Sequence, residues 1–132
     1  MDPEILVVED DPETLDLITI ILERQGYSVV VAHDARAVLE IVPSRNPDLI
    51  ITDIRMPHID GVEMIKRIRA MGLMRRFVPI LVVTAYQMEH AAQAIGAGAS
   101  RVLGKPFKDD LLLACVKDLL RPGSAQTAKA MD

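Results

Sequence analysis

The chain has 132 residues, of which 50% are hydrophobic and 3% are aromatic, and its formal net charge is −4. This profile suits one globular domain with an aliphatic core, and it argues against the basic surface that general nucleic-acid binding needs. The single cysteine excludes an internal disulfide, and no apolar run is long enough for a membrane-spanning helix. We therefore expect a cytoplasmic domain that binds neither nucleic acid nor membrane directly.

Four short runs are almost continuously apolar, and a weaker fifth run follows them. They cover residues 5–9, 28–32, 48–53, 78–83 and 100–104. Continuous apolar residues, as opposed to alternating ones, are typical of strands buried on both faces of a parallel sheet. The fifth run, SRVLG, is expected to form an edge strand.

Segments with helical spacing follow each of these runs. They cover residues 12–26, 34–44, 60–72, 87–99 and 108–121. Asp11 occupies the N-cap position of the first helix, Pro12 suits its first turn and Gly26 its end. Pro43 is expected to help end the second helix.

The third helical segment, residues 60–72, has two contrasting faces. One face is apolar and is expected to point inward, with Val62, Ile65 and Ile68. The other face is basic and is expected to point into solvent, with Lys66, Arg67 and Arg69.

The order of the elements is strand then helix, repeated five times. This alternation predicts an α/β fold, a single doubly wound (βα)5 flavodoxin-like domain with helices on both faces of a parallel sheet. The common strand order for such a sheet is 2-1-3-4-5. We assign the domain to residues 1–121 and expect residues 122–132 to be a flexible tail or linker stub.

Polar side chains gather where the predicted strands end. Glu9 and Asp10 follow the first strand, Asp53 the third, Thr84 the fourth and Lys105 the fifth. The carboxyl ends of parallel strands meet at one edge of the sheet, so these groups are expected to lie together. Clustered carboxylates favour a cation such as Mg²⁺, and a carboxylate can act as a nucleophile that forms an aspartyl-phosphate.

Four blocks of sequence carry a family resemblance. ILVVEDD, LIITDIRMPHIDG, VVTAY and GKPF resemble, in order and spacing, the signature blocks of the response-regulator receiver domain of two-component phosphorelay signalling. The resemblance covers roughly residues 4–121. Each block alone is weak evidence, but all four fall in register at predicted strand ends.

The resemblance implies a role for each polar residue at the strand ends. Asp53 would be the phosphoacceptor and also a metal ligand, and Asp10 would bind Mg²⁺ directly, with Mn²⁺ as a possible substitute. Glu9 would assist the metal through water or hold the charge of the site, and the backbone carbonyl of Arg55 would be a further ligand. Lys105 would pair with Asp53 or with its phosphate.

Other residues would tune the switch by the same resemblance. Thr84 would bind the phosphoryl group and move with it, and Pro106 would follow a cis peptide bond that aims the preceding lysine. Tyr86 and Arg55 occupy positions at which family members tune phosphate lifetime. Gly61 would ease the turn into the third helix.

One position departs from the pattern of many family members, which carry Tyr or Phe three residues before the lysine. Here that residue is Val102, which cannot make the same rotation as an aromatic ring. We therefore expect signalling to depend on Thr84, on the loop that follows it and on the helix at 87–99.

The resemblance also implies partners. The phosphoryl donor would be a sensor histidine kinase or a histidine phosphotransfer protein. An output domain, a partner protein or a second copy of the chain would bind the face formed by residues 87–121. On this reading the chain is a switch that catalyses only its own phosphorylation and dephosphorylation, and is not an enzyme in the usual sense.

Three alternatives remain open at this point. The chain could be a receiver-like binding module without phosphotransfer, although Asp10, Asp53, Thr84 and Lys105 are all retained. It could be a phosphohydrolase with an aspartate nucleophile, but such enzymes usually carry a second aspartate where Arg55 stands. A flavodoxin-like cofactor binder would need a phosphate loop where the acids at 9–11 lie.

Overall fold

A computed structural model describes residues 2–55, 59–71, 77–85, 88–121 and 129–130 of the chain. The strands are β1 (Glu4–Val8), β2 (Ser28–Ala32), β3 (Leu49–Thr52), β4 (Ile80–Thr84), β5 (Arg101–Gly104) and β6 (Lys129–Ala130). The helices are α1 (Pro12–Arg24), α2 (Ala35–Arg45), α3 (Gly61–Met71), α4 (Met88–Ala97) and α5 (Asp109–Leu119). No helix in the described part of the chain is long and apolar enough to cross a membrane.

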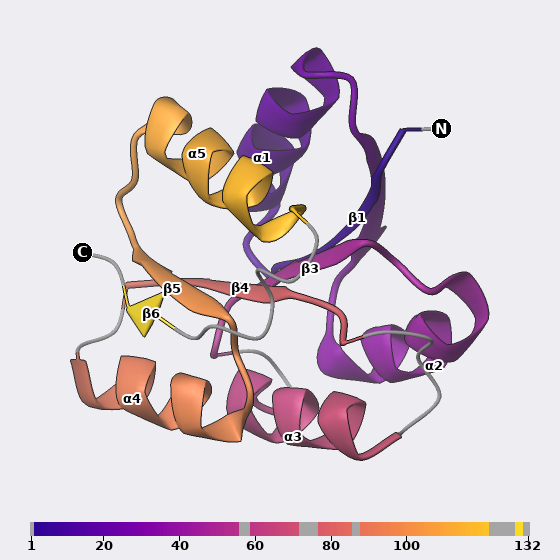
Figure 1. Cartoon of the computed structure of the whole chain (residues 1–132), viewed down its shortest axis with the longest axis vertical. Helices are drawn as coiled ribbons and strands as arrows, with labels where there is room; N and C mark the ends of the chain where they lie inside the picture. The colour runs from indigo at the N-terminus through magenta and orange to yellow at the C-terminus, as the bar shows by residue number, and fades with distance from the viewer. Residues whose placement is uncertain (1, 56–58, 72–76, 86–87, 122–128, 131–132) are drawn as a thin grey trace.

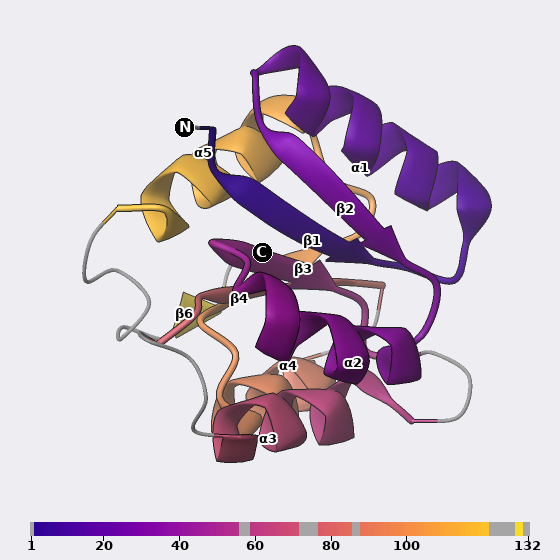
Figure 2. The ribbon, with the colours of Figure 1, turned by 90° about the vertical axis from the view of Figure 1, so that its right-hand side faces the viewer.

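The strands form one parallel sheet in the order β2-β1-β3-β4-β5-β6 (Figure 1). The predicted fold and the order 2-1-3-4-5 are therefore confirmed, with β6 added beside β5. Strands β1 and β3 are neighbours although α1, β2 and α2 separate them in the chain. Their adjacency brings the C-terminal ends of β1 and β3 to the same edge of the sheet, and Figure 2 shows the two strands side by side.

Helices cover both faces of the sheet and enclose two apolar clusters. Helices α1 and α5 lie on one face, and α2, α3 and α4 lie on the other (Figure 1). The apolar stripe of α1 is buried, with Leu15, Ile18, Ile21 and Leu22. The residues of β1, β3 and β4 are buried on both faces of the sheet, apart from Glu4, as their continuous apolar runs predicted.

The start of α1 follows the sequence prediction. The Asp11 carboxylate accepts a hydrogen bond from the backbone N–H of Thr14 at 3.2 Å, and Pro12 occupies the first helical position. The helix thus begins immediately after the acids at the end of β1, and Asp11 satisfies the Thr14 donor of its first turn. Of the two preceding acids, Glu9 is buried and Asp10 is exposed.

The prediction for Pro43 was wrong. Pro43 lies inside α2, which continues to Arg45 and ends at Asn46 in the left-handed conformation with φ 48°. A proline near the end of a helix removes only its own N–H from the hydrogen-bond ladder. The following residues keep their bonds, and the N–H of Asn46 still donates to the Val42 carbonyl at 3.1 Å.

The predicted outward orientation of Arg69 was also wrong. Val62 packs against the core and Ile65 and Ile68 are buried, as predicted, and Lys66 and Arg67 are exposed. The Arg69 guanidinium, however, donates to backbone carbonyls of two other segments. Its helical position lies at the border of the apolar face, and a long side chain can reach inward from there.

The edge of the sheet beyond β5 differs from the expectation as well. Lys129–Ala130 form a two-residue strand whose register pairs Arg101 with Lys129 and Val102 with Ala130. Strand β5 is therefore not the edge in this structure. The boundary between domain and tail at residue 121 stays a prediction, because residues 122–128 lie outside the described part of the chain.

Candidate functional site

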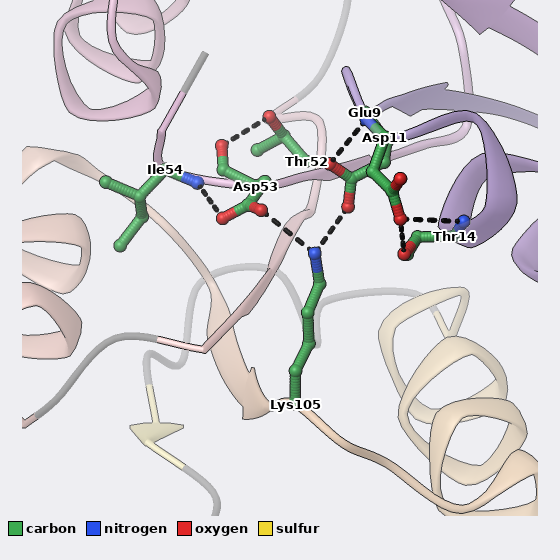
Figure 3. Close-up of polar contacts among 7 residues, drawn as sticks. All are labelled: Glu9, Asp11, Thr14, Thr52, Asp53, Ile54 and Lys105. Carbon is green, nitrogen blue, oxygen red and sulfur yellow. Dashed lines mark hydrogen bonds and ion pairs between the residues drawn. The ribbon is translucent and has the colours of Figure 1, made fainter.

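Two carboxylates and one ammonium group meet at the carboxyl edge of the sheet. The Lys105 Nζ lies 2.5 Å from Glu9 Oε1 and 2.9 Å from Asp53 Oδ2 (Figure 3). Glu9 follows β1, Asp53 follows β3 and Lys105 follows β5, so three different strand ends build the cluster. The sequence analysis predicted this meeting from the topology of the sheet.

Burial makes the cluster electrostatically tight. The Glu9 side chain is 3% exposed, and the Lys105 side chain is 19% exposed. Burial raises the pKa of Glu9, and the hydrogen bond from Lys105 opposes that rise in part. Burial alone would lower the pKa of Lys105, but hydrogen bonds and charges from Glu9 and Asp53 raise the pKa overall. In this partly buried site, the Lys105 ammonium and the two carboxylates therefore stabilise one another.

The backbone around Asp53 is held by short-range contacts. The N–H of Ile54 donates to Asp53 Oδ1 at 2.6 Å, and the Thr52 hydroxyl donates to the Asp53 carbonyl at 2.8 Å. The N–H of Asp53 donates to the Val8 carbonyl at 3.3 Å, which joins the ends of β1 and β3. These contacts leave Asp53 Oδ2 directed at Lys105 (Figure 3).

Gly61 lets the first turn of α3 approach this backbone. A Cβ atom at residue 61 would lie 2.4 Å from the Asp53 carbonyl oxygen and 2.7 Å from the Ile54 Cα. The Gly61 N–H donates to the Ile54 carbonyl at 2.5 Å. The sequence analysis assigned Gly61 to the turn, but the requirement seen here is space beside the Asp53 backbone.

Thr84 and Lys105 are connected through the backbone. Thr84 is the last residue of β4 and is 1% exposed, and its carbonyl accepts the N–H of Lys105 at 2.9 Å. The peptide bond between Lys105 and Pro106 is cis, as the family resemblance implied. Thr84 therefore lies directly beside the segment that carries the lysine.

The remaining predicted residues are placed as follows. Asp10 follows Glu9 directly, Arg55 lies two residues after Asp53, and both residues are exposed. Val102 is buried in β5 and belongs to the apolar cluster beneath α2, α3 and α4, so no aromatic ring occupies this position. Tyr86 lies outside the described residues.

The acids present fit a hydrated Mg²⁺ better than a metal cage built from side chains alone. In the part of the chain that the structure describes, no three His, Cys, Asp or Glu side chains are arranged to hold a metal. Mg²⁺ usually keeps several waters and takes only one or two carboxylates, and the surroundings of Glu9, Asp10 and Asp53 offer that donor chemistry. The single Lys105 ammonium contacts two of these three acids, Glu9 and Asp53.

Residues 5–117 match the sequence pattern of the response regulator receiver domain family. The chain belongs to this family. A receiver domain is a signalling module of two-component systems and not a classical enzyme. The family assignment made from the four sequence blocks is therefore confirmed.

Curated relatives agree with this assignment. The transcriptional regulatory protein FixJ of Bradyrhizobium diazoefficiens is 33% identical over 132 residues, covering 97% of this chain and 63% of FixJ. The response regulator MprA of Mycobacterium tuberculosis is 37% identical over 135 residues, covering 99% of this chain and 57% of MprA. The receiver thus spans little more than half the length of these relatives.

Solved structures show the same fold. A putative response regulator from Chloroflexus aurantiacus superimposes with a TM-score of 0.87 and 31% identity, covering 91% of this chain and 98% of that one. The receiver domain of the sensor histidine kinase PA1611 from Pseudomonas aeruginosa gives a TM-score of 0.84 and 30% identity, with coverages of 91% and 98%. That structure holds a magnesium ion coordinated in its active-site cleft.

Sequence reasoning missed two parts of the site. It did not find that Lys105 contacts Glu9 as well as Asp53, because a reach between β1 and β5 depends on the packed sheet. It also did not assign Thr52, whose hydroxyl bonds the Asp53 carbonyl. A threonine directly before a strand-end aspartate was the available signal for the second.

Proposed function

We propose that this receiver is a phosphorylation-dependent switch that accepts a phosphoryl group onto Asp53. The donor is a phosphohistidine on a sensor histidine kinase or a histidine phosphotransfer protein. An Asp53 carboxylate oxygen forms a bond to phosphorus while the phosphorus–nitrogen bond of the phosphohistidine breaks, and the imidazole leaves. Hydrolysis of the acyl phosphate later restores the carboxylate.

The observation that carries this proposal is the position of the Lys105 ammonium between Asp53 and Glu9. The ammonium lies 2.9 Å from the nucleophilic carboxylate. It is therefore placed to bind a phosphoryl oxygen once the negative charge lies on the phosphoryl group instead of on the carboxylate. Thr84 supports the same role, because it ends the neighbouring strand and its carbonyl bonds the Lys105 backbone. On phosphorylation, its hydroxyl would donate to the phosphoryl group.

Glu9, Asp10 and Asp53, with the backbone carbonyl of Arg55, would hold Mg²⁺, and Mn²⁺ could replace it. The metal, when bound, neutralises the charge on the transferring phosphoryl oxygens. The magnesium-containing receiver of the Pseudomonas aeruginosa kinase supports this choice of cation. In the protein itself, the Glu9 carboxyl group contacts the Lys105 ammonium, and this contact holds the ammonium next to the acceptor.

The test is an intact-mass measurement after incubation with acetyl phosphate and Mg²⁺. We expect one added phosphoryl group on the native chain, and none on Asp53→Asn or in a metal-free sample. Asp60→Asn is the matched control, because this exposed carboxylate lies in the same connection and caps α3 through the Glu63 N–H at 2.9 Å. The control should take up the group as the native chain does.

Three results would overturn the proposal. An adduct that persists in Asp53→Asn would place the acceptor elsewhere. No adduct on the native chain, with no consumption of the donor, would favour a receiver-like binding module. Rapid donor consumption without an adduct would favour a phosphohydrolase.

The output surface is proposed to be the face formed by α4, β5 and α5. It would bind an output domain, a partner protein or a second copy of the chain. Val102 in β5 replaces the aromatic residue that many receivers carry, so the conformational change is proposed to run through Thr84 and α4. Amide shifts in α4 that do not respond to a phosphoryl mimic would contradict this route.

A further inference from the structure

Arg69 ties three segments together at the end of α4 that is remote from Thr84. Its Nε and Nη2 donate to the Gly98 carbonyl at 3.1 and 2.8 Å, and its Nη1 donates to the Val78 carbonyl at 2.6 Å. The Phe77 ring covers the guanidinium, with the Arg69 Cζ 3.6 Å from the ring centroid. We call Arg69, Phe77, Val78 and Gly98 the arginine clasp.

The clasp joins segments that are far apart in the chain. Arg69 lies in the last turn of α3, Val78 immediately precedes β4, and Gly98 follows α4. Helices α3 and α4 lie side by side on the same face of the sheet (Figure 1). The clasp therefore fixes the C-terminal end of α4 against both its neighbouring helix and the sheet.

The chemistry of the clasp makes it a firm attachment. Burial lowers the pKa of Arg69 to about 10, so the group stays charged at neutral pH, and its described hydrogen bonds go to carbonyl dipoles. Loss of the donor would leave two backbone carbonyls without this partner, and hydrogen bonds from charged groups are among the strong ones. Gly98 has φ +121°, and a Cβ there would lie 2.8 Å from the Arg69 Cγ, so the close approach depends on glycine.

Further bonds hold the same end of α4. The N–H of Ala99 donates to the Ala94 carbonyl at 2.9 Å. The Ser100 N–H donates to the Ile80 carbonyl at 2.8 Å, and the Ile80 N–H donates to the Ser100 hydroxyl at 3.1 Å. The other end of α4 begins at Met88, only four residues after Thr84.

We propose that the arginine clasp makes the C-terminal end of α4 a fixed pivot, about which the helix tilts when Thr84 moves. This inference rests on the proposed function, in which phosphorylation displaces Thr84. A pulled helix that is pinned at one end changes its direction, and its exposed face turns relative to β5. Without the pin, the displacement would be absorbed by movement or fraying of the last turn of α4.

The test compares amide hydrogen exchange in the native chain and in Arg69→Met. Without any phosphoryl donor, we expect the amides of Gly98, Ala99 and Ser100 to exchange about tenfold faster in Arg69→Met. Arg67→Met is the matched control, because Arg67 is exposed and bonds only Glu63 among the contacts described for it, at 3.1 Å. It should leave those three amides unchanged.

The phosphorylated proteins test the pivot itself, after intact mass has verified the adduct. In the native chain, phosphorylation should change exchange at Ala92 and Gln93, whose amides close the first turn of α4, and leave residues 98–100 within about twofold. In Arg69→Met, the change should spread to residues 98–100. Equal changes at both ends of α4 in the native chain would overturn the inference.

A second variant protects the test against a folding failure. Phe77→Leu removes the ring over the guanidinium but leaves the hydrogen bonds of Arg69, so it should speed exchange at residues 98–100 by a smaller factor. Unchanged exchange at these residues in both Arg69→Met and Phe77→Leu would overturn the clasp. This comparison needs no phosphoryl donor, so its failure is distinguishable from a failure of the proposed function, which appears as a missing adduct on Asp53.

Discussion

Lys105 and Arg69 are both partly buried cations, but they are held by opposite kinds of partner. Lys105 lies between two carboxylates, Glu9 and Asp53, while Arg69 bonds the carbonyls of Val78 and Gly98. The carboxylates outweigh the burial of Lys105 and raise its pKa, whereas burial lowers the pKa of Arg69 to about 10.

This difference in partners indicates that the Lys105 contacts can change during function, whereas the Arg69 contacts stabilise the fold. A lysine bound by anions can exchange one anion for another, so a phosphoryl group can replace a carboxylate as its partner. An arginine bound by backbone carbonyls has no such substitute inside the protein, and its bonds persist while the fold persists. The end of the molecule around Asp53 is therefore suited to change, and the end around Gly98 is suited to stay fixed.

The largest expected effect comes from removing the lysine charge. Lys105→Met should slow phosphorylation by acetyl phosphate about a hundredfold or more, because it removes a preorganised positive group at the developing phosphoryl charge. The initial rate of adduct formation by intact mass measures this. Lys108→Met is the control, since Lys108 is exposed just before α5. A rate for Lys105→Met close to that of Lys108→Met would contradict the role of Lys105.

The next effect concerns the backbone that carries Asp53. Gly61→Ala should lower the free energy of unfolding by about 2 kcal/mol or more, because the new methyl group would lie 2.4 Å from the Asp53 carbonyl oxygen. Gly96→Ala is the matched control in α4, where a Cβ meets nothing within 4 Å. It should stabilise the protein by up to about 1 kcal/mol through helix propensity. Urea unfolding of both variants measures the difference, and equal effects would contradict the close approach.

The third effect comes from removing the contacts of Arg69 with the Val78 and Gly98 carbonyls. Arg69→Met should lower the free energy of unfolding by about 2 kcal/mol, since two carbonyls lose a charged donor. Arg67→Met should cost less than about 0.5 kcal/mol, because its pair with Glu63 is exposed on the helix surface. Similar midpoints for the two variants in chemical unfolding would show that buried Arg69 stabilises the fold no more than exposed Arg67 does.

The smallest expected effect is on how the stability of the protein depends on pH through Lys105. The pKa of Lys105 is raised above its ordinary value of 10.5, so its contribution to stability is complete below pH 10.5 and is lost as the pH rises through the folded-state pKa. Lys105→Arg keeps its charge over this range. Stability should therefore fall more steeply above pH 10.5 in the native chain than in Lys105→Arg. Parallel alkaline unfolding curves would contradict the raised pKa.

Much of the fold was predictable from the runs of residues themselves. The five apolar runs, the helical stripes and the cap at Asp11 all depend on spacing within one element, and the structure confirms them. The alternation of strands and helices predicted a parallel sheet, and the observed strand order is the common one for such a sheet. The gathering of Glu9, Asp53 and Lys105 was predictable for the same reason, because parallel strands end at one edge.

Contacts between distant segments were decided by the tertiary structure alone. Whether Arg69 points into solvent or toward Gly98 depends on how α3 packs against α4, and helical spacing contains no information about that neighbour. The clearance at Gly61 depends on how closely α3 approaches the Asp53 backbone. The added strand at Lys129–Ala130 depends on the open edge of β5.

The sequence by itself determined which elements form and which chemical groups end the strands, because these follow from local periodicity and from the geometry of a parallel sheet. Only the tertiary structure decided how the charges are shared. It placed one ammonium between two carboxylates and one guanidinium between two carbonyls, since each of those pairings joins residues that are far apart in the chain.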